Sequence, residues 1–581
     1  MKKTNEPLLS FEFAQSNGQI HPLTFRDPIK VIKAETLDKV LPCLQLVQQA
    51  ISEGYYAAGF VSYESAPAFD SAFQVRDGSA MPLLWFGIFT EPQRQALESS
   101  RNYQLSEWKP SVSMDEYRNA ISSIKQGIED GVTYQTNYTI RLNSAFQGDD
   151  LKFFDQLRRA QDSNYCAYIN TGEHSILSAS PELFFHLEDN QITTRPMKGT
   201  ISRGKTLLED RQNAEWLFQS EKNRAENLMI VDLLRNDLSM IATPHSVQVP
   251  RLFDIEPYPT VHQMTSTITA TIEPNTQLID IFNALFPCGS ITGAPKISTM
   301  EKIAELESTP RDVYCGAIGY ITPNHEAIFN VPIRTVVIDQ KTGTATYGVG
   351  GGITWDSTTE DEYDEILAKA KLLEVERPVF QLLESLLLKD GEIFLLEEHL
   401  NRLRNSAEYF RFELDGDAIR SYLLQFATEK NVGEFKIRLL VEKHGGLSIE
   451  GQAITQPRTP FKIMLADEPV DQNNPFLYHK TTNRAVYSNY QQKFPDVYDV
   501  LLWNKDGEVT EFTNGNVVLE IDGVNYTPPI SSGLLAGTFR ESLLRNDIIQ
   551  EKVLTVQDLK KASKIWFINS VRKWLEVELL D

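Results

Sequence analysis

Four segments between residues 134 and 366 place charged and hydroxyl side chains inside apolar stretches, a pattern typical of a buried functional site. A buried polar group without a partner costs about 1–3 kcal/mol, so these groups require one another or a ligand. Their glycines would let backbone amides approach an anion closely. The segments are Tyr134–Tyr138, Ser180–Phe185 with Arg195–Thr200, Lys222–Asn227, and Gly289–Lys296 with Gly348–Gly352 and Asp361–Glu365.

The glycine-containing segments do not fit a nucleotide site. A phosphate-binding loop needs the spacing G-x-x-x-x-G-K-[ST], and in Gly289–Lys296 a proline, Pro295, comes directly before the lysine. The glycines of Gly348–Gly352 lack the G-x-G-x-x-G spacing, and taken alone they could simply turn a strand into a loop. We therefore exclude nucleotide binding.

The bulk composition limits the partners. The chain has 581 residues, with 56 basic and 79 acidic side chains and a formal net charge of -23. This charge repels nucleic acid and anionic membranes, and an anionic substrate would need local cations or a metal. No apolar run reaches the length of a membrane span or of a signal-peptide core, and the four cysteines are scattered without metal-binding spacing. These features predict a cytoplasmic protein with reduced cysteines.

The segments must be positioned by helices and strands of a mixed fold. Hydrophobic periodicity predicts helices near 36–53 and over 113–130, 150–162, 207–240 and 358–375, and strands over 175–187 and 313–322. Thr335–Gln340 and Thr344–Gly348 predict a β-hairpin, because Gly343 lies in the turn between them.

A domain boundary is predicted near residue 376, because Pro378 interrupts the helical pattern there. Residues 1–375 form the first predicted domain, with an N-terminal part over 1–110 and a catalytic part over 111–375. Residues 376–581 begin with a new hairpin around Asp390 and Gly391, and they are long enough for an independent domain.

Taken in order, the four segments resemble those of the chorismate-utilising enzymes, the family of anthranilate, isochorismate, salicylate and aminodeoxychorismate synthases. The resemblance covers residues 113–375. It implies an α+β fold in which two large sheets form a sandwich with helices outside. It also implies Mg²⁺-dependent chemistry on the dianion chorismate, with Glu226 and Glu365 as the metal ligands. Glu362 lies three residues before Glu365, on the same helical face, and is the alternative ligand.

The resemblance also assigns roles in binding and catalysis. It implies that Thr292, Lys296, Arg334 and the amides of Gly350, Gly351 and Gly352 bind the substrate carboxylate, and that His262 lies near the substrate ring. Lys198, within Pro196–Thr200, resembles the lysine of the aminodeoxychorismate synthase branch, where anthranilate synthases have a different residue. This branch implies that Lys198 attacks chorismate C2, that Glu182 protonates the departing 4-hydroxyl, and that ammonia then enters at C4.

The nitrogen source is expected to lie outside the chain. No glutaminase signature is visible, since a cysteine nucleophile with a downstream His-x-Glu pair is missing from the sequence. We therefore expect either a separate glutamine amidotransferase subunit or free ammonia.

Residues 376–581 resemble the fold-type IV enzymes that use pyridoxal 5′-phosphate, which include class IV aminotransferases and aminodeoxychorismate lyase. The matching segments are Glu398–Leu403, Tyr478–Arg484, Gly507–Asn516, Thr527–Pro529 and Gly533–Thr538. The resemblance implies that Lys480 carries the cofactor and moves protons, and that Glu511 keeps the pyridine nitrogen protonated. The phosphate would be bound near the residues Arg402, Thr513, Gly537 and Thr538.

The substrate of this second domain follows from its pairing with the first. Leu382–Ser385 replaces the Asp-Gly-Phe/Tyr loop of many relatives, so this domain alone does not identify the substrate. The combination predicts a bifunctional enzyme of folate-precursor biosynthesis that makes 4-aminobenzoate. The alternatives are an anthranilate synthase-like enzyme with an aminotransferase-like tail, and a synthase with an inactive regulatory or scaffold domain. Fold-type IV enzymes are usually dimers, so a homodimer through this domain is also expected.

Overall fold

The computed structural model describes residues 6–99, 101–455 and 461–580, which divide into two compact units. The first unit contains Met1–Ser202 and Ala214–Arg377, and the second contains Arg203–Asn213 and Pro378–Asp581. The short segment Arg203–Asn213 therefore belongs to a different unit from the residues on both sides of it. Within the second unit, the Tyr409 hydroxyl donates a hydrogen bond of 2.8 Å to the Gly204 carbonyl.

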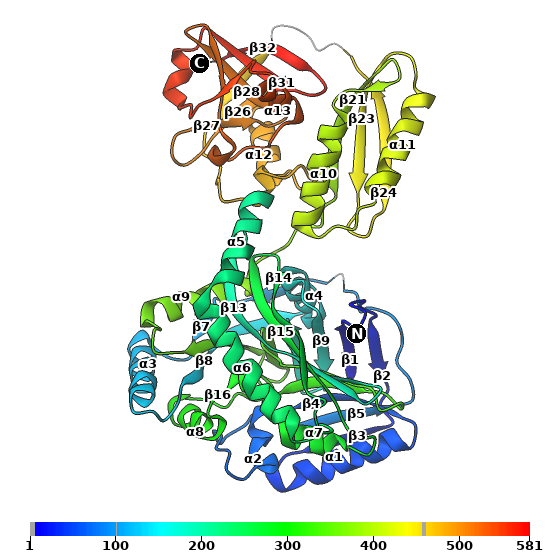
Figure 1. Ribbon diagram of the computed structural model, residues 1–581, viewed down its shortest axis with the longest axis vertical. Helices are drawn as coiled ribbons and strands as arrows, with labels where there is room; N and C mark the ends of the chain where they lie inside the picture. Colours follow the sequence, from blue (N-terminus) through cyan, green and yellow to red (C-terminus); the bar gives the residue numbers. More distant parts are fainter. Residues whose placement is uncertain (1–5, 100, 456–460, 581) are drawn as a thin grey trace. The chain divides into compact units, whose positions relative to one another are not determined.

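Two large sheets form the first unit (Figure 1). The first sheet has the strand order β16 (Gly293–Ala294), β8 (Gln135–Gly148), β20 (Thr344–Ile353), β19 (Thr335–Asp339), β10 (His174–Ser180), β9 (Tyr165–Asn170), β1 (Leu8–Phe13) and β2 (Leu23–Arg26), with β6 (Tyr103–Leu105) and β7 (Lys109–Pro110) paired to β8. The second has the order β13 (Met197–Ser202), β15 (Val261–Thr271), β12 (Gln191–Arg195), β11 (Leu183–Glu188), β18 (Ala327–Asn330), β17 (Ala317–Ile321), β4 (Tyr56–Val61), β5 (Leu84–Phe89) and β3 (Lys30–Ala34), with β14 (Gln248–Pro257) paired to β15.

One apolar cluster joins the two sheets. It contains Leu9 and Phe11 from the first sheet and Phe60, Ile318 and Ile328 from the second, all of them buried. The alternation of apolar side chains along these strands places one face of each sheet against the other.

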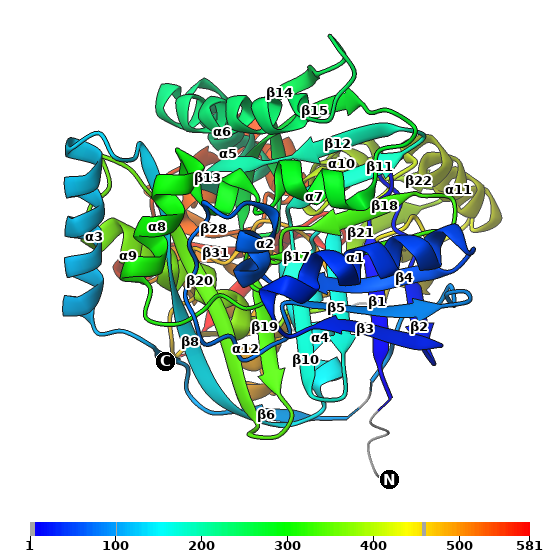
Figure 2. The same cartoon turned by 90° about the horizontal axis from the view of Figure 1, so that it is seen from below.

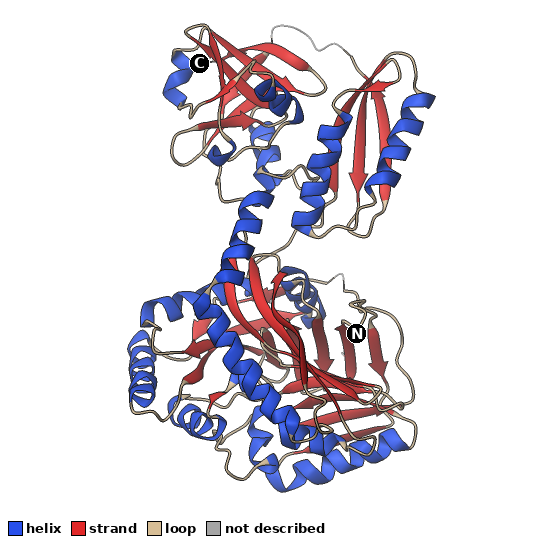
Figure 3. Cartoon of the chain, viewed as in Figure 1, coloured by secondary structure: helices blue, strands red, loops and turns tan. Residues whose placement is uncertain are grey.

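Helices cover the outer face of each sheet (Figures 2 and 3). The first sheet is covered by α3 (Met114–Glu129), α4 (Asp150–Gln161) and α9 (Thr359–Ala370), and the second by α1 (Leu37–Ser52), α6 (Glu221–Ser239) and α7 (Leu278–Leu285). The predicted two-sheet sandwich with outer helices is confirmed.

Two predicted elements are each divided in the structure. The helix predicted over 207–240 is two helices, α5 (Leu207–Gln219) and α6, because the Ser220 side chain accepts a bond from the Asn223 amide and caps a new helix. The strand predicted over 175–187 is β10 followed by β11, because Pro181 cannot donate a ladder hydrogen bond. Both breaks matter, since Glu226 lies in the first turns of α6 and Glu182 lies at the gap between the strands.

The second unit contains two smaller sheets. One has the order β22 (Glu392–Ile393), β21 (Leu382–Lys389), β23 (Glu434–Val441) and β24 (Leu447–Ala453), packed with α10 (Leu396–Phe410) and α11 (Gly416–Glu429). The other has the order β27 (Val509–Phe512), β26 (Asp499–Trp503), β25 (Lys462–Leu465), β32 (Lys573–Leu579), β31 (Lys564–Asn569), β28 (Asn516–Ile521), β29 (Val524–Thr527) and β30 (Gln550–Glu551), with α12 (Ala485–Lys493) and α13 (Thr538–Arg545). Among the described residues, no helix is long and apolar enough to cross a membrane.

Two candidate active sites

A cavity of about 370 Å³ in the first unit gathers most of the residues predicted for the synthase site. Its walls come from strands β8, β13, β15 and β20 and from helices α5 (Leu207–Gln219), α6 and α9, with the residues just before β11 and β19. The predicted residues that line it are Glu182, Lys198, Glu226, Arg334, Gly350, Gly351, Gly352, Glu362 and Glu365.

Lys198 reaches this cavity from β13, where burial favours the neutral form of its amine. Burial lowers the pKa of Lys198, although the nearby Glu226 carboxylate raises it in part. A Cβ atom added at Gly352 would lie 2.8 Å from the Lys198 Nζ and 1.8 Å from the Gln135 Nε2. A side chain at position 352 would therefore push the ends of the Lys198 and Gln135 side chains aside.

Glu182 is suited to hold a proton at neutral pH. Its side chain is only 2% exposed, and among the described residues its Oε1 has no hydrogen-bond partner. Burial raises the pKa of Glu182 to about 7, against the opposing effects of the Ser290 hydroxyl and of Lys198. An unpartnered carboxyl oxygen on the wall of a cavity can donate its proton to a bound molecule.

Three carboxylates in the same cavity fit a magnesium ion. Burial raises the pKa of Glu226 and that of Glu362, and the neighbouring Glu365 carboxylate raises both further. Burial would also raise the pKa of Glu365, but the Lys369 ammonium, 2.6 Å from its Oε1, lowers it below the usual value. A divalent cation would relieve the repulsion among these groups, and carboxylate oxygens are its preferred ligands. The residues present therefore fit the predicted metal.

Arg334 supplies a positive charge opposite these acids. It precedes β19 with a φ of 52°, a strained backbone conformation for a residue other than glycine. Burial lowers its pKa, and among the described residues its guanidinium has no ion-pair partner. A buried guanidinium without an acid is expected to bind an anion.

Three predicted residues do not line the cavity. His262 is buried on β15. The Thr292 hydroxyl donates to the Cys288 carbonyl at 3.2 Å, and the Lys296 ammonium forms an ion pair of 2.8 Å with Asp237. Their predicted roles toward the substrate remain predictions, and for Lys296 the partner in this structure is a neighbouring acid.

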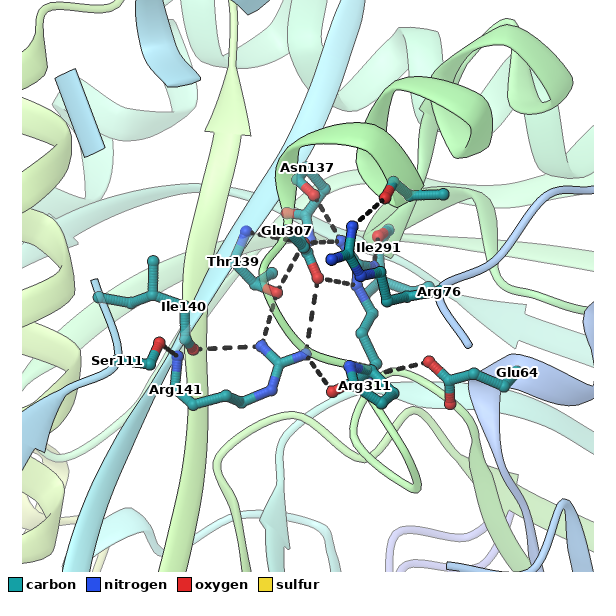
Figure 4. A network of polar contacts seen from close by, with 12 residues as sticks. Glu64, Arg76, Ser111, Asn137, Thr139, Ile140, Arg141, Ile291, Glu307 and Arg311 are labelled. Carbon is teal, nitrogen blue, oxygen red and sulfur yellow. Dashed lines mark hydrogen bonds and ion pairs between the residues drawn. The ribbon is translucent and has the colours of Figure 1, made fainter. Parts of the chain in front are cut away.

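A buried network that the sequence did not reveal supports one wall of this cavity (Figure 4). The Arg311 guanidinium donates to the carbonyls of Asn137 and Ile291, each at 2.7 Å, and both of these residues line the cavity. Glu307 balances its charge through bonds of 2.6 and 3.0 Å and also pairs with Arg141 at 3.5 Å. The network therefore fixes the backbone of two segments that are distant in sequence.

The second unit has a larger cavity, of about 720 Å³, that contains the residues predicted to bind pyridoxal phosphate. Burial, assisted by the Arg402 guanidinium, lowers the pKa of Lys480 to about 7, so its amine is available at neutral pH. Burial raises the pKa of Glu511 to about 8, and its Oε1 accepts a bond of 2.8 Å from the Tyr487 hydroxyl. Burial makes the charged form of Glu511 unfavourable, and a protonated pyridine nitrogen beside it would offset that desolvation cost. The residues therefore fit the predicted cofactor.

Arg402 is oriented by Glu384. This acid belongs to Leu382–Ser385, the segment that replaces the Asp-Gly-Phe/Tyr loop of many relatives. Glu384, on β21, accepts bonds from Arg402 Nε at 2.9 Å and Nη2 at 2.6 Å, and lies 2.7 Å from His399 Nδ1. The other ring nitrogen of His399 lies 3.2 Å from the Thr538 hydroxyl. Glu384 thus connects two residues that are predicted to lie near the phosphate. Arg402, Thr513 and Gly537 line the cavity, whereas Thr538 lies behind it.

Replacing Glu384 with glutamine is expected to destabilise this part of the second unit. Burial would raise the pKa of Glu384, but Arg402 and His399 lower it from 4.5 to about 2. This lowering of the Glu384 pKa corresponds to about 3 kcal/mol of stabilisation of the folded state by the ionised carboxylate. The stabilisation is present above pH 4.5 and is lost as the pH falls towards 2. Near pH 7, hydrogen exchange of the α10 amides should accelerate on the order of 100-fold in Glu384→Gln.

The matched control for this variant is Glu398→Gln, on helix α10 itself. Glu398 pairs at 3.0 Å with Arg545, whose side chain is 63% exposed. Exposed pairs contribute little, so exchange in this variant should change less than about fivefold. Equal acceleration in both variants would show that Glu384 has no special stabilising role.

The comparisons with known proteins identify a family for each part of the chain. Residues 10–374 match the model of the chorismate binding enzyme family, and residues 381–580 match that of amino-transferase class IV. The chain belongs to the chorismate binding enzyme family, with a class IV aminotransferase domain after it. Both predicted resemblances are confirmed.

Individual relatives give a more specific description of the match over residues 10–374. Aminodeoxychorismate synthase component 1 of Salmonella typhimurium is 42% identical over 264 residues, which cover 45% of this chain and 58% of that protein. The protein of the same name from Bacillus subtilis is 40% identical over 44% of this chain and 54% of its own length. The chain thus spans between half and two thirds of the length of these curated relatives. The crystal structure of anthranilate synthase component I from Streptococcus pneumoniae matches with a TM-score of 0.53 and 25% identity, over 63% of this chain and 92% of that one.

Proposed function

We propose that the chain makes 4-aminobenzoate from chorismate in two reactions. The first unit converts chorismate and ammonia to 4-amino-4-deoxychorismate and water, and the second eliminates pyruvate from this product. The observation that carries the proposal is the position of Lys198, a buried amine of lowered pKa that shares one cavity with Glu182 and with Glu226. The names of the most similar curated relatives support the same reaction.

In the first reaction, each residue of the cavity has a defined task. The neutral Lys198 amine forms a bond to C2 of chorismate while Glu182 gives a proton to the departing 4-hydroxyl. Ammonia then forms a bond to C4 and gives its extra proton to the Glu182 carboxylate, and the bond between C2 and Lys198 breaks, which restores the lysine. Arg334 binds a substrate carboxylate together with the backbone amides of Gly350–Gly352. Mg²⁺, held by Glu226 and Glu365 with Glu362 beside them, would neutralise charge on the substrate.

In the second reaction, Lys480 holds the cofactor through its ε-amine and moves a proton between carbon atoms of the substrate. Glu511 keeps the pyridine nitrogen protonated, and Arg402 contributes to binding of the phosphate. Pyridoxal phosphate, when bound, would supply an electron sink for the elimination of pyruvate.

A separate glutamine amidotransferase subunit is the proposed source of ammonia. The relatives from Salmonella typhimurium and Bacillus subtilis are named as component 1 of their synthases, which supports a second component for this chain as well. Free ammonium would replace that subunit in an assay of the purified chain.

Identification of the aromatic product tests the whole proposal. The chain would be incubated with chorismate, Mg²⁺, pyridoxal phosphate and ammonium, and the products separated by chromatography. We expect 4-aminobenzoate and pyruvate in equal amounts. Accumulation of 4-amino-4-deoxychorismate would refute only the lyase assignment, whereas anthranilate as the product would refute the role given to Lys198.

The synthase rate is expected to fall as the pH rises above 7. Because the pKa of Glu182 is raised from 4.5 to about 7, the carboxyl is protonated below that pH and loses its proton above it. At constant free NH₃, kcat/KM should therefore decrease about tenfold per pH unit on the alkaline side. The Glu182→Gln variant should be slow and lack this decrease. A wild-type rate that stays level between pH 7 and 9 would exclude Glu182 as the acid.

A further inference from the structure

A cluster of three possible metal ligands lies in the first unit, away from its cavity. His186 and Glu188 are on β11, and Glu326 directly precedes β18. One ligand atom from each side chain lies within 4.8 Å of the others. None of the three residues lines the cavity of the proposed synthase reaction.

The sheet itself brings these side chains together. Strands β11 and β18 are antiparallel neighbours, with His186 opposite Ile328 and Leu187 opposite Ala327. Because side chains alternate along a strand, His186 and Glu188 lie on one face, and Glu326 is directed to the same face as Ile328. His186 and Glu188 thus lie on one strand, and Glu326 lies immediately before the neighbouring strand.

The charges in the cluster lack a partner of opposite sign. Among the described residues, no hydrogen bond or ion pair reaches the side chain of Glu188 or that of Glu326. Burial raises the pKa of Glu326, and the carboxylates of Glu188 and Asp189 raise it further, with no basic group opposing them. Two adjacent half-buried carboxylates without a cation are unfavourable unless a ligand neutralises them.

His186 is the independent observation that indicates a metal ion. It is only 8% exposed, and among the described residues neither ring nitrogen has a hydrogen-bond partner. Burial lowers its pKa, so the ring is neutral at pH 7 and offers a lone pair to a metal.

We propose that His186, Glu188 and Glu326 bind a divalent transition-metal ion, for which Zn²⁺ is the probe. One imidazole and two carboxylates are a ligand set that Zn²⁺ accepts at about 2.0–2.2 Å, whereas Mg²⁺ and Ca²⁺ prefer oxygen ligands alone. The ion ties β11 to the β17–β18 hairpin and is distinct from the Mg²⁺ of the synthase cavity.

Zinc titration of the full chain in excess Mg²⁺ tests this proposal, because Mg²⁺ occupies the carboxylates of the synthase cavity. Isothermal calorimetry should show one Zn²⁺ site that is at least about 100-fold weaker in His186→Ala and in Glu326→Gln. The matched control is His325→Ala, since His325 is exposed next to Glu326 and lies outside the cluster. This variant should bind Zn²⁺ as the wild type does.

Two further measurements distinguish loss of the metal site from loss of the folded first unit. Co²⁺ bound in place of Zn²⁺ should give visible absorption bands that disappear in Glu326→Gln, a half-buried change expected to leave the fold intact. Synthase activity of each variant reports whether the first unit is folded, so failure of the metal proposal is separate from failure of the proposed function. Unchanged Zn²⁺ affinity in both His186→Ala and Glu326→Gln would overturn the site, as would displacement of Zn²⁺ by Mg²⁺.

Discussion

Substitution of Lys198 with alanine is expected to reduce the conversion of chorismate by at least about 10³-fold. The reason is that the variant removes the buried amine proposed as the nucleophile. The measurement is the initial rate of chorismate consumption with ammonium and Mg²⁺, at saturating substrate. Cofactor binding in the second unit should be unchanged, which would show that the chain is otherwise intact.

The variant Lys198→Arg separates nucleophilic attack from a purely electrostatic role. Arginine keeps a positive charge in the cavity but is not a neutral amine at any accessible pH. If Lys198 only attracts an anion, Lys198→Arg should retain a large part of the rate. If Lys198 attacks C2, Lys198→Arg should be as slow as Lys198→Ala. Lys341 lies in an exposed turn, so Lys341→Ala is the control for a lysine substitution that should not change the rate of chorismate consumption.

Replacing Lys480 with alanine is expected to stop release of pyruvate, with a decrease of at least about 10⁴-fold in the lyase rate. The buried amine, with its pKa lowered to about 7, is the group in the larger cavity best suited to hold the cofactor covalently. The variant should therefore also lose the cofactor absorbance that remains with the wild type after desalting. Because the first unit is unaltered, 4-amino-4-deoxychorismate should accumulate.

This result also distinguishes the enzyme from a scaffold. An inactive second domain would release no pyruvate in the wild type, and Lys480→Ala would then change nothing. A wild-type lyase rate in Lys480→Ala would instead show that another group performs the elimination. Replacement of the exposed Lys505 by alanine is the matched control, since its ammonium pairs at 3.4 Å with Asp471 on the surface.

Much of the architecture could be predicted because it depends on local patterns. The hairpin of β19 and β20 follows from alternating residues around Gly343, and α3 begins with the capping box of Ser113 and Glu116. The glycines at 350–352 lie where expected because they are part of a continuous strand. Motifs of this kind are short and ordered, so a sequence shows them directly.

Features that depend on distant contacts could not be predicted. The bond from Arg311 to the Asn137 carbonyl joins residues 174 positions apart, and nothing near Arg311 in sequence indicates it. Lys296 was predicted from its motif, but its contact with Asp237 depends on how α6 and the start of α8 (Lys296–Leu306) pack. Lys369 was missed although it lies four residues after Glu365, a spacing that places both on one helical face. The predicted role of Lys296 toward the substrate remains a prediction.

The position of Arg203–Asn213 has a consequence for the order of synthesis on the ribosome. This segment is part of the second unit, yet it is translated 165 residues (378 minus 213) before Pro378, where the rest of that unit begins. At about 5–20 residues per second, roughly 10–30 seconds pass before the first of its later partners is made. A gene divided at residue 377 would leave the segment on the wrong polypeptide, so two separately expressed halves are not equivalent to the intact chain.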